Sequence, residues 1–170
     1  MSAATSISTE SLEHVLEALA GEHETLIELA KIHREALRKA DSPAIARIAE
    51  LRNETNQRIV ALDKERARIV SEISKAIGLP SANVTVRALI SQIGGPASKR
   101  LAALAEKLRQ LIENARVEQS ALREATAAFA GHLGGMLATV IQTCSVAKTY
   151  TARGKMAPGI AMPASMDLRH

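Results

Sequence analysis

The chain has 170 residues, among them 31 Ala and 18 Leu, but only one Phe, one Tyr and no Trp. Sandwiches and barrels need β-branched and aromatic strands with frequent turns, whereas Ala and Leu are strong helix formers, so the composition excludes most β classes and predicts an all-α fold. The net charge of +4 at pH 7 is unevenly spread, because residues 83–100 carry three basic and no acidic side chains and residues 147–170 carry four and one.

The first predicted helix begins at Ser8 or Thr9, which leaves residues 1–8 as a flexible N-terminus, and it ends near Arg38 and Lys39. Its apolar residues recur at alternating spacings of four and three, which is typical of a helix that packs lengthwise on others. The predicted buried seam comprises Leu12, Leu16, Leu19, His23, Leu26, Ala30, His33 and Leu37.

A tight turn precedes the second predicted helix. Ser42 is expected to cap its free amides, and Pro43 takes the first helical position, where a missing amide hydrogen does no harm. Gly78 and Pro80 are expected to end this helix soon after Lys75. Its predicted seam comprises Ile48, Thr55, Ile59, Leu62, Arg66, Ile69 and Ile73.

The connector, residues 78–96, has Gly and Pro breaks on both sides of residues 83–93. These residues are predicted to form a short helix, although the β-branched residues at its start leave a strand as the alternative. A third long helix starts near Pro96. Glu118 lies within the seam of this helix, and Arg66 lies within the seam of the second helix. The two side chains either pair as a polar layer or reach out to solvent. The third seam comprises Leu101, Leu104, Leu108, Leu111, Ala115, Glu118, Leu122, Ala125 and Phe129.

The helix lengths predict the architecture. At about 1.5 Å per residue, the first two helices would each be roughly 50 Å long, and the third long helix reaches that length near residue 130. We therefore expect an elongated antiparallel three-long-helix coiled-coil bundle over residues 9–150, with a short connector helix. Residues 132–148 would either extend beyond the bundle or fold back on it. Residues 151–170 contain Gly and Pro without periodicity, which predicts a flexible, extended C-terminal tail.

Residues 125–147 contain no Asp, Glu, Lys or Arg. This run raises the question of a transmembrane helix, but its glycines, His132 and Gln142 offset the apolar side chains, so no stable membrane insertion is expected. The segment is then either a helix buried all round by its own bundle or an apolar surface that binds a partner. The tail beyond it combines Pro and Gly with unbranched Met side chains, which suits either an adaptable binding segment or an ordinary frayed terminus.

No catalytic or metal-binding pattern is found. His14, His23 and His33 lie near several glutamates, but none has a Glu three positions before it, as di-iron bundles require. Cys144 has no neighbouring base, and no Gly-rich loop ends in Lys-Ser or Lys-Thr. We expect no enzyme activity, no cofactor and no metal. One cysteine, and an N-terminus without basic and apolar signal regions, predict a cytoplasmic protein.

Two local motifs carry a family resemblance. Leu62-Asp63-Lys64-Glu65-Arg66, followed by Ile69-Val70 and Gly78, is similar to a Leu-acidic-x-x-Arg helix that ends in Leu-Leu and then Gly. Thr149-Tyr150 with Gly154 is similar to a Tyr-x-x-x-Gly that closes a last helix. With two long capped helices, a Gly/Pro connector and a longer helix, the chain resembles the FlgN-like family of flagellar export chaperones. It departs from that family at Val117 and Asn56, where relatives often have Asn and Lys.

The resemblance implies a non-enzymatic, cytoplasmic chaperone that binds hook–filament junction (hook-associated) proteins with its C-terminal region and delivers them to the type III export apparatus. The alternative is a coiled-coil adaptor or scaffold that acts through homodimerisation; nucleic-acid binding is not expected, because no aromatic platform accompanies the basic segments. The protein is expected to be a monomer or weak homodimer. The candidate partner-binding residues are Leu137, Ile141, Tyr150, Met156, Ile160, Met162 and Met166.

Overall fold

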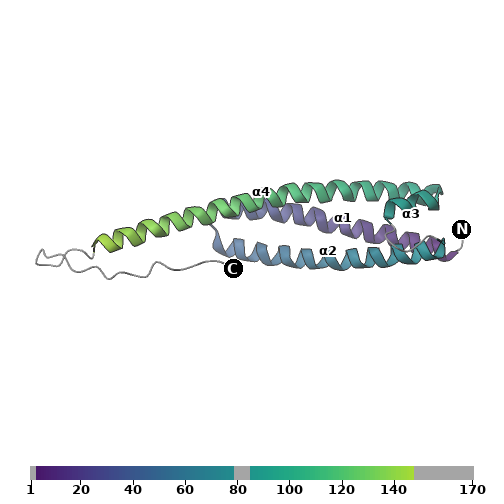
Figure 1. Cartoon of the computed structure of the whole chain (residues 1–170), viewed down its shortest axis with the longest axis horizontal. Helices are drawn as coiled ribbons and strands as arrows, with labels where there is room; N and C mark the ends of the chain where they lie inside the picture. Colours follow the sequence, from purple (N-terminus) through teal and green to yellow (C-terminus); the bar gives the residue numbers. More distant parts are fainter. Residues whose placement is uncertain (1–2, 79–84, 148–170) are drawn as a thin grey trace, which may run out of the picture. The chain divides into compact units, whose positions relative to one another are not determined.

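The computed structural model describes residues 3–78 and 85–147, without the side chains of residues 3–8 and 144–147. These residues form four helices and no strand, so the predicted all-α class is confirmed. The chain divides into two compact units, unit 1 (Met1–Thr126) and unit 2 (Ala127–His170), and the last helix contributes residues to both. The helices are α1 (Ala3–Arg38), α2 (Ser42–Ala76), α3 (Val86–Ile93) and α4 (Gly95–Ala147) (Figure 1).

The helix α1 begins at Ala3, so the predicted start at Ser8 or Thr9 is wrong. Residues 3–8 contain no Gly or Pro, and Ala is the best helix former, so nothing stops the helix before that point. The helix ends as predicted, at Arg38.

The turn after α1 is a Schellman motif. The amide of Ala40 donates to the carbonyl of Leu37, and the amide of Asp41 donates to the carbonyl of Ala36. Ala40 takes the left-handed conformation, with φ of 53°, at the position where helices most often place Gly. The motif lets α2 begin only four residues after α1 ends, so the two helices become antiparallel neighbours.

The N-cap of α2 is Asp41, not Ser42 as predicted. The Asp41 carboxylate accepts a hydrogen bond of 3.1 Å from the amide of Ala44, while Ser42 and Pro43 are the first two helical residues. A carboxylate accepts a free amide hydrogen and also interacts favourably with the positive end of the helix dipole, which a hydroxyl does only weakly. At the other end, Gly78 follows the helix with φ of 72°, as a Gly stop signal requires.

The connector helix forms, as α3, and the described residues of the connector, 78 and 85–96, contain no strand. The hydroxyl of Thr85 caps α3 by accepting a hydrogen bond of 3.2 Å from the amide of Ala88. Gly94 and Gly95, with φ of 64° and 70°, turn the chain directly into α4. Ser98 of α4 also donates a hydrogen bond of 3.0 Å to the carbonyl of Ile90, which ties α3 to the start of α4.

The core of unit 1 is built from all four helices. The residues of the predicted seams are buried or half-buried, including the two histidines and Thr55. Leu89 of the connector helix joins the same cluster, so α3 contributes to the core as well as linking α2 to α4. Buried members of the cluster are Leu12, Val15, Leu16, Leu19, Ile69, Val70, Ile73, Leu89, Leu101 and Leu108.

The ion pairs between helices show in which direction each long helix runs. Glu22 of α1 binds Arg58 of α2 at 2.8 Å, and three further pairs among the described residues join α1 to α4. In those three pairs the residue numbers of both helices rise together, so α1 and α4 run in the same direction and α2 runs opposite to α1. In Figure 1, α1, α2 and the unit 1 part of α4 lie lengthwise alongside one another. The α1–α4 pairs are Glu13–Arg100, Glu24–Lys107 and Arg34–Glu118.

Of the two alternatives for Arg66 and Glu118, the shared polar layer does not form. Arg66 binds Asp63 on its own helix at 2.8 Å, and Glu118 binds Arg34 of α1. Arg34 was not singled out in the sequence because it lies beside the seam, from which its long side chain reaches across to α4.

Acidification is expected to destabilise unit 1. Burial lowers the pKa of His23 and of His33 below 6.5, and the nearby Arg52 lowers that of His33 further. Among the described residues, the Nδ1 atom of each ring lacks a hydrogen-bond partner. Because the native state binds fewer protons than the unfolded state, the stabilisation is complete above pH 6.5 and is lost as the pH falls through the native pKa values.

The variant His33→Gln should therefore flatten the fall in the free energy of unfolding below pH 6.5. Urea denaturation at a series of pH values measures this slope. The matched control, His14→Gln, removes an exposed histidine from the same helix. An equal change of slope in both variants would contradict the role assigned to burial.

Candidate protein-interaction site

The described part of unit 2 is a helical segment of α4 with exposed apolar side chains. Every residue from 131 to 143 is exposed. The large apolar residues among them retain about half of their accessible surface: Leu133 48%, Met136 53%, Leu137 61%, Val140 57% and Ile141 57%. The prediction of a helix buried all round is therefore wrong for these residues, and the alternative of an apolar surface is supported.

These five residues lie on one face of the helix. Their spacings of three, one, three and one place them within an arc of about 140°, since successive helical residues are about 100° apart. Small or weakly polar residues occupy the rest of the circumference, including Gly131, Gly135 and Ala138. We call Leu133, Met136, Leu137, Val140 and Ile141 the apolar face.

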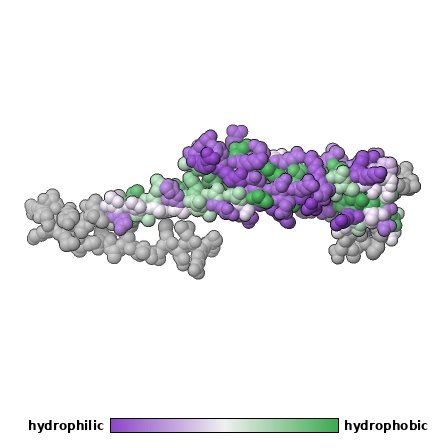
Figure 2. All heavy atoms as spheres, turned by 90° about the horizontal axis from the view of Figure 1, so that it is seen from above, coloured by the Kyte–Doolittle hydropathy of each residue, from purple (hydrophilic) through white to green (hydrophobic). Residues whose placement is uncertain are grey.

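The helix beside the apolar face offers few free polar groups. The hydroxyl of Thr139 donates to the carbonyl of Gly135 at 3.0 Å, and that of Thr143 donates to the carbonyl of Thr139 at 2.9 Å. Residues 125–147 also lack any charged side chain. Figure 2 shows the described surface of this segment as mostly white and green, unlike the largely purple surface of unit 1.

Two glycines in this segment have no steric role within the described chain. A Cβ atom added at Gly134 or Gly135 would meet no atom within 4 Å. Each Gly destabilises a helix interior by about 0.5–1 kcal/mol relative to Ala. Close packing inside the described chain therefore does not require these glycines.

Burial of the apolar face would contribute substantially to association. Covering a whole apolar side chain of this size is worth about 1.5–3 kcal/mol, and about half of each is exposed, so the five together correspond to roughly 4–8 kcal/mol before the cost of association. The five side chains of the apolar face carry no charge and no hydrogen-bonding group other than the weakly accepting sulfur of Met136. The described residues also contain no cluster of three or more His, Cys, Asp or Glu side chains suited to a metal ion.

The structure locates only part of the predicted site. Leu137 and Ile141 lie on the apolar face, whereas Tyr150, Met156, Ile160, Met162 and Met166 lie outside the described residues. Leu133, Met136 and Val140 also lie on the apolar face but were not among the predicted residues, although their helical spacing relative to Leu137 and Ile141 would have identified them. The apolar run of α4 falls short of a membrane span, as does every other helix in the described part of the chain.

Comparison with known proteins identifies the family. The family model FlgN, described as FlgN protein, matches residues 1–158. That match includes α1 to α4 and the whole apolar face. No curated protein and no solved structure matches the chain. Since the match extends over most of the sequence, the chain belongs to the FlgN family of flagellar chaperones.

Proposed function

We propose that the protein is a flagellar export chaperone that binds hook–filament junction (hook-associated) proteins and delivers them to the type III export apparatus. The observation that supports this most is the apolar face, five half-exposed side chains on a helix segment without charge. Membership of the FlgN family supports the same role. The protein would act without catalysis, in the cytoplasm, as a monomer or weak homodimer.

The apolar face suits the recognition of an amphipathic client helix. Apolar residues at i, i+3, i+4, i+7 and i+8 can pack lengthwise on a second helix with the same spacing, as in coiled coils. In the proposed arrangement, the long helices of unit 1 form an antiparallel three-helix coiled-coil bundle that acts as a scaffold. Residues 148–170, which contain three of the five Met residues, would add further contacts to the client.

Truncation tests this proposal. A variant that ends after Tyr150 should keep the melting temperature of the bundle almost unchanged and should bind hook–filament junction proteins at least tenfold more weakly, because the Met-containing segment is lost. Isothermal titration calorimetry with the purified junction proteins of the same organism measures the affinity. A full-length variant in which Met156, Ile160, Met162 and Met166 are all Ser separates loss of apolar contacts from loss of length.

Equal affinity of the truncated and the full-length protein would place the client site elsewhere.

The homodimeric scaffold is the alternative role, because the spacing of the apolar face would also suit a second copy of the same helix. Sedimentation equilibrium distinguishes the two: a stable dimer that is lost in Leu137→Asp, together with no binding of junction proteins, would favour the scaffold.

A further inference from the structure

A groove in unit 1 lies between α2 and α4, beside α3. It consists of two adjoining hollows of about 940 Å³ and 310 Å³, which share Arg66, Val86, Ala105 and Arg109 as lining residues. The smaller hollow reaches down to α1, where Leu16 and Leu19 line it. The groove therefore runs along the side of the bundle between α2 and α4, above the buried Leu16 and Leu19 of α1.

The lining of the groove is mainly apolar. Ile59 of α2, Ile90 of α3 and Ile112 of α4 pack against the core with one side and remain partly accessible from the groove. Ala102 and Ala105, whose side chains are small, leave the space that a larger residue would fill. Such a surface can accept the apolar side of a partner helix.

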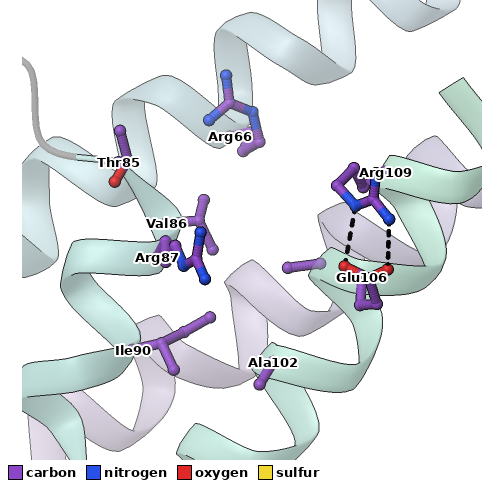
Figure 3. A pocket seen from close by; sticks show the side chains of 9 residues that line it. Arg66, Thr85, Val86, Arg87, Ile90, Ala102, Glu106 and Arg109 are labelled. Carbon is purple, nitrogen blue, oxygen red and sulfur yellow. Dashed lines mark hydrogen bonds and ion pairs between the residues drawn. The ribbon is translucent and has the colours of Figure 1, made fainter. Parts of the chain in front are cut away.

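Three arginines from three different helices surround the larger hollow: Arg66, Arg87 and Arg109 (Figure 3). Arg109 binds Glu106 through two hydrogen bonds, of 3.0 Å and 2.7 Å, and these bonds lower the pKa of Glu106 to about 2. Arg66 is bound to Asp63. Arg87 lies within electrostatic range of the same Glu106. Three arginines therefore face two carboxylates, Asp63 and Glu106, and the lining keeps an excess of one positive charge.

We propose that this groove binds an acidic amphipathic helix of a partner protein, with its apolar side against Ile90 and Ile112 and a carboxylate on Arg87. The α4 residues that line the groove run from Ala102 to Ile112, which corresponds to about 15 Å or three helical turns. The excess of one positive charge beside an apolar floor favours an acidic helix over a basic one, because charge complementarity across an interface directs both specificity and association rate.

The charge of the groove argues against the chain's own C-terminal segment as its occupant, since residues 147–170 carry four basic residues and one acidic residue. The groove shares no residue with the apolar face. The proposal is therefore independent of the proposed client site, and either can fail without the other.

A synthetic peptide pair tests the proposal. The probe is a capped 14-residue peptide with Leu at helical i, i+3, i+4 and i+7 positions and Glu and Ala elsewhere, and the control peptide has Lys in place of every Glu. Fluorescence anisotropy with the full-length protein should show binding of the Glu peptide at least tenfold tighter than the Lys peptide. The affinity should fall as salt is added, because exposed charges are screened.

Protein variants locate the binding. Arg87→Glu should weaken binding of the Glu peptide at least tenfold, and Ala102→Trp should do the same by filling the groove without a change of charge. The matched control is Arg116→Glu, an exposed arginine of α4 outside the groove that pairs with Glu113; it should leave the affinity unchanged. Circular dichroism verifies that each variant remains helical.

Four outcomes would overturn the proposal. They are no binding of the Glu peptide to the wild-type protein, an equal loss in Arg116→Glu and Arg87→Glu, displacement of the Glu peptide by a peptide of residues 151–170, and a homodimer that Arg87→Glu abolishes. The third would make the chain's own C-terminal segment the occupant, and the fourth would make a second copy the occupant.

Discussion

Replacing Leu101 by Ala is expected to lower the free energy of unfolding by about 2–5 kcal/mol. The Leu101 side chain is 0% exposed and belongs to a cluster that contains Leu12 of α1, Ile73 of α2 and Leu89 of α3. Truncation would leave a cavity in a cluster that draws residues from all four helices, and the long helices around the site cannot close the cavity without a shift along their length. Urea denaturation followed by circular dichroism measures the loss.

The matched control for Leu101→Ala is Leu137→Ala, which makes the same substitution in the same helix. Leu137 is 61% exposed, and Ala is a slightly better helix former than Leu, so the free energy of unfolding should change by no more than about 0.5 kcal/mol. Similar losses in the two variants would show that α4 is not anchored in the core at Leu101.

The second large effect is expected for the double variant Leu137→Asp and Ile141→Asp. It should weaken binding of hook–filament junction proteins about a hundredfold or more, because two carboxylates would be buried against an apolar client surface without partners. Both side chains are more than half exposed in the free protein, so the melting temperature should change little. Calorimetric titration with the client and a thermal melt provide the two measurements.

A control with the same charge and spacing distinguishes the apolar face from the rest of the helix. Ala138→Asp with Gln142→Asp places two carboxylates one turn apart outside the apolar face, about 100° around α4 from Leu137 and Ile141. If the first pair weakens client binding a hundredfold, this control pair should weaken it less than tenfold. If both pairs weaken binding equally, general charge on the segment matters and the apolar face is not the contact surface.

The periodic pattern of the sequence was sufficient to predict the long helices and the buried side of each. The spacing of Leu12, Leu16 and Leu19 predicts one helical face whatever lies opposite, because helix geometry alone brings such residues together. The capped start of α3 and the Gly residues after it are likewise local signals. Family membership was also recognisable from the sequence, through the Leu62–Arg66 motif and the order of the elements.

The candidate site was predicted in part. Absence of charge from residues 125–147 indicated an unusual segment, but periodicity could not decide between a helix covered by its own bundle and an exposed one. That depends on how far the neighbouring helices extend. Exposure of Leu137 and Ile141 is therefore a result of the structure.

Pairing between charged side chains also depended on tertiary structure. Position within a seam left open whether Arg66 pairs with Glu118 or both reach to solvent. In the structure Glu118 binds Arg34 and Arg66 binds Asp63. Long side chains reach several neighbours, and small changes in the register and rotation of the helices decide which one lies within bonding distance. The groove lined by Arg87 and Arg109 likewise became visible only in the structure. The sequence by itself determined the helices and their inward faces, because both follow from local helix geometry. The partners of those faces depended on the register between helices, and that register is set jointly by residues that are distant in the sequence.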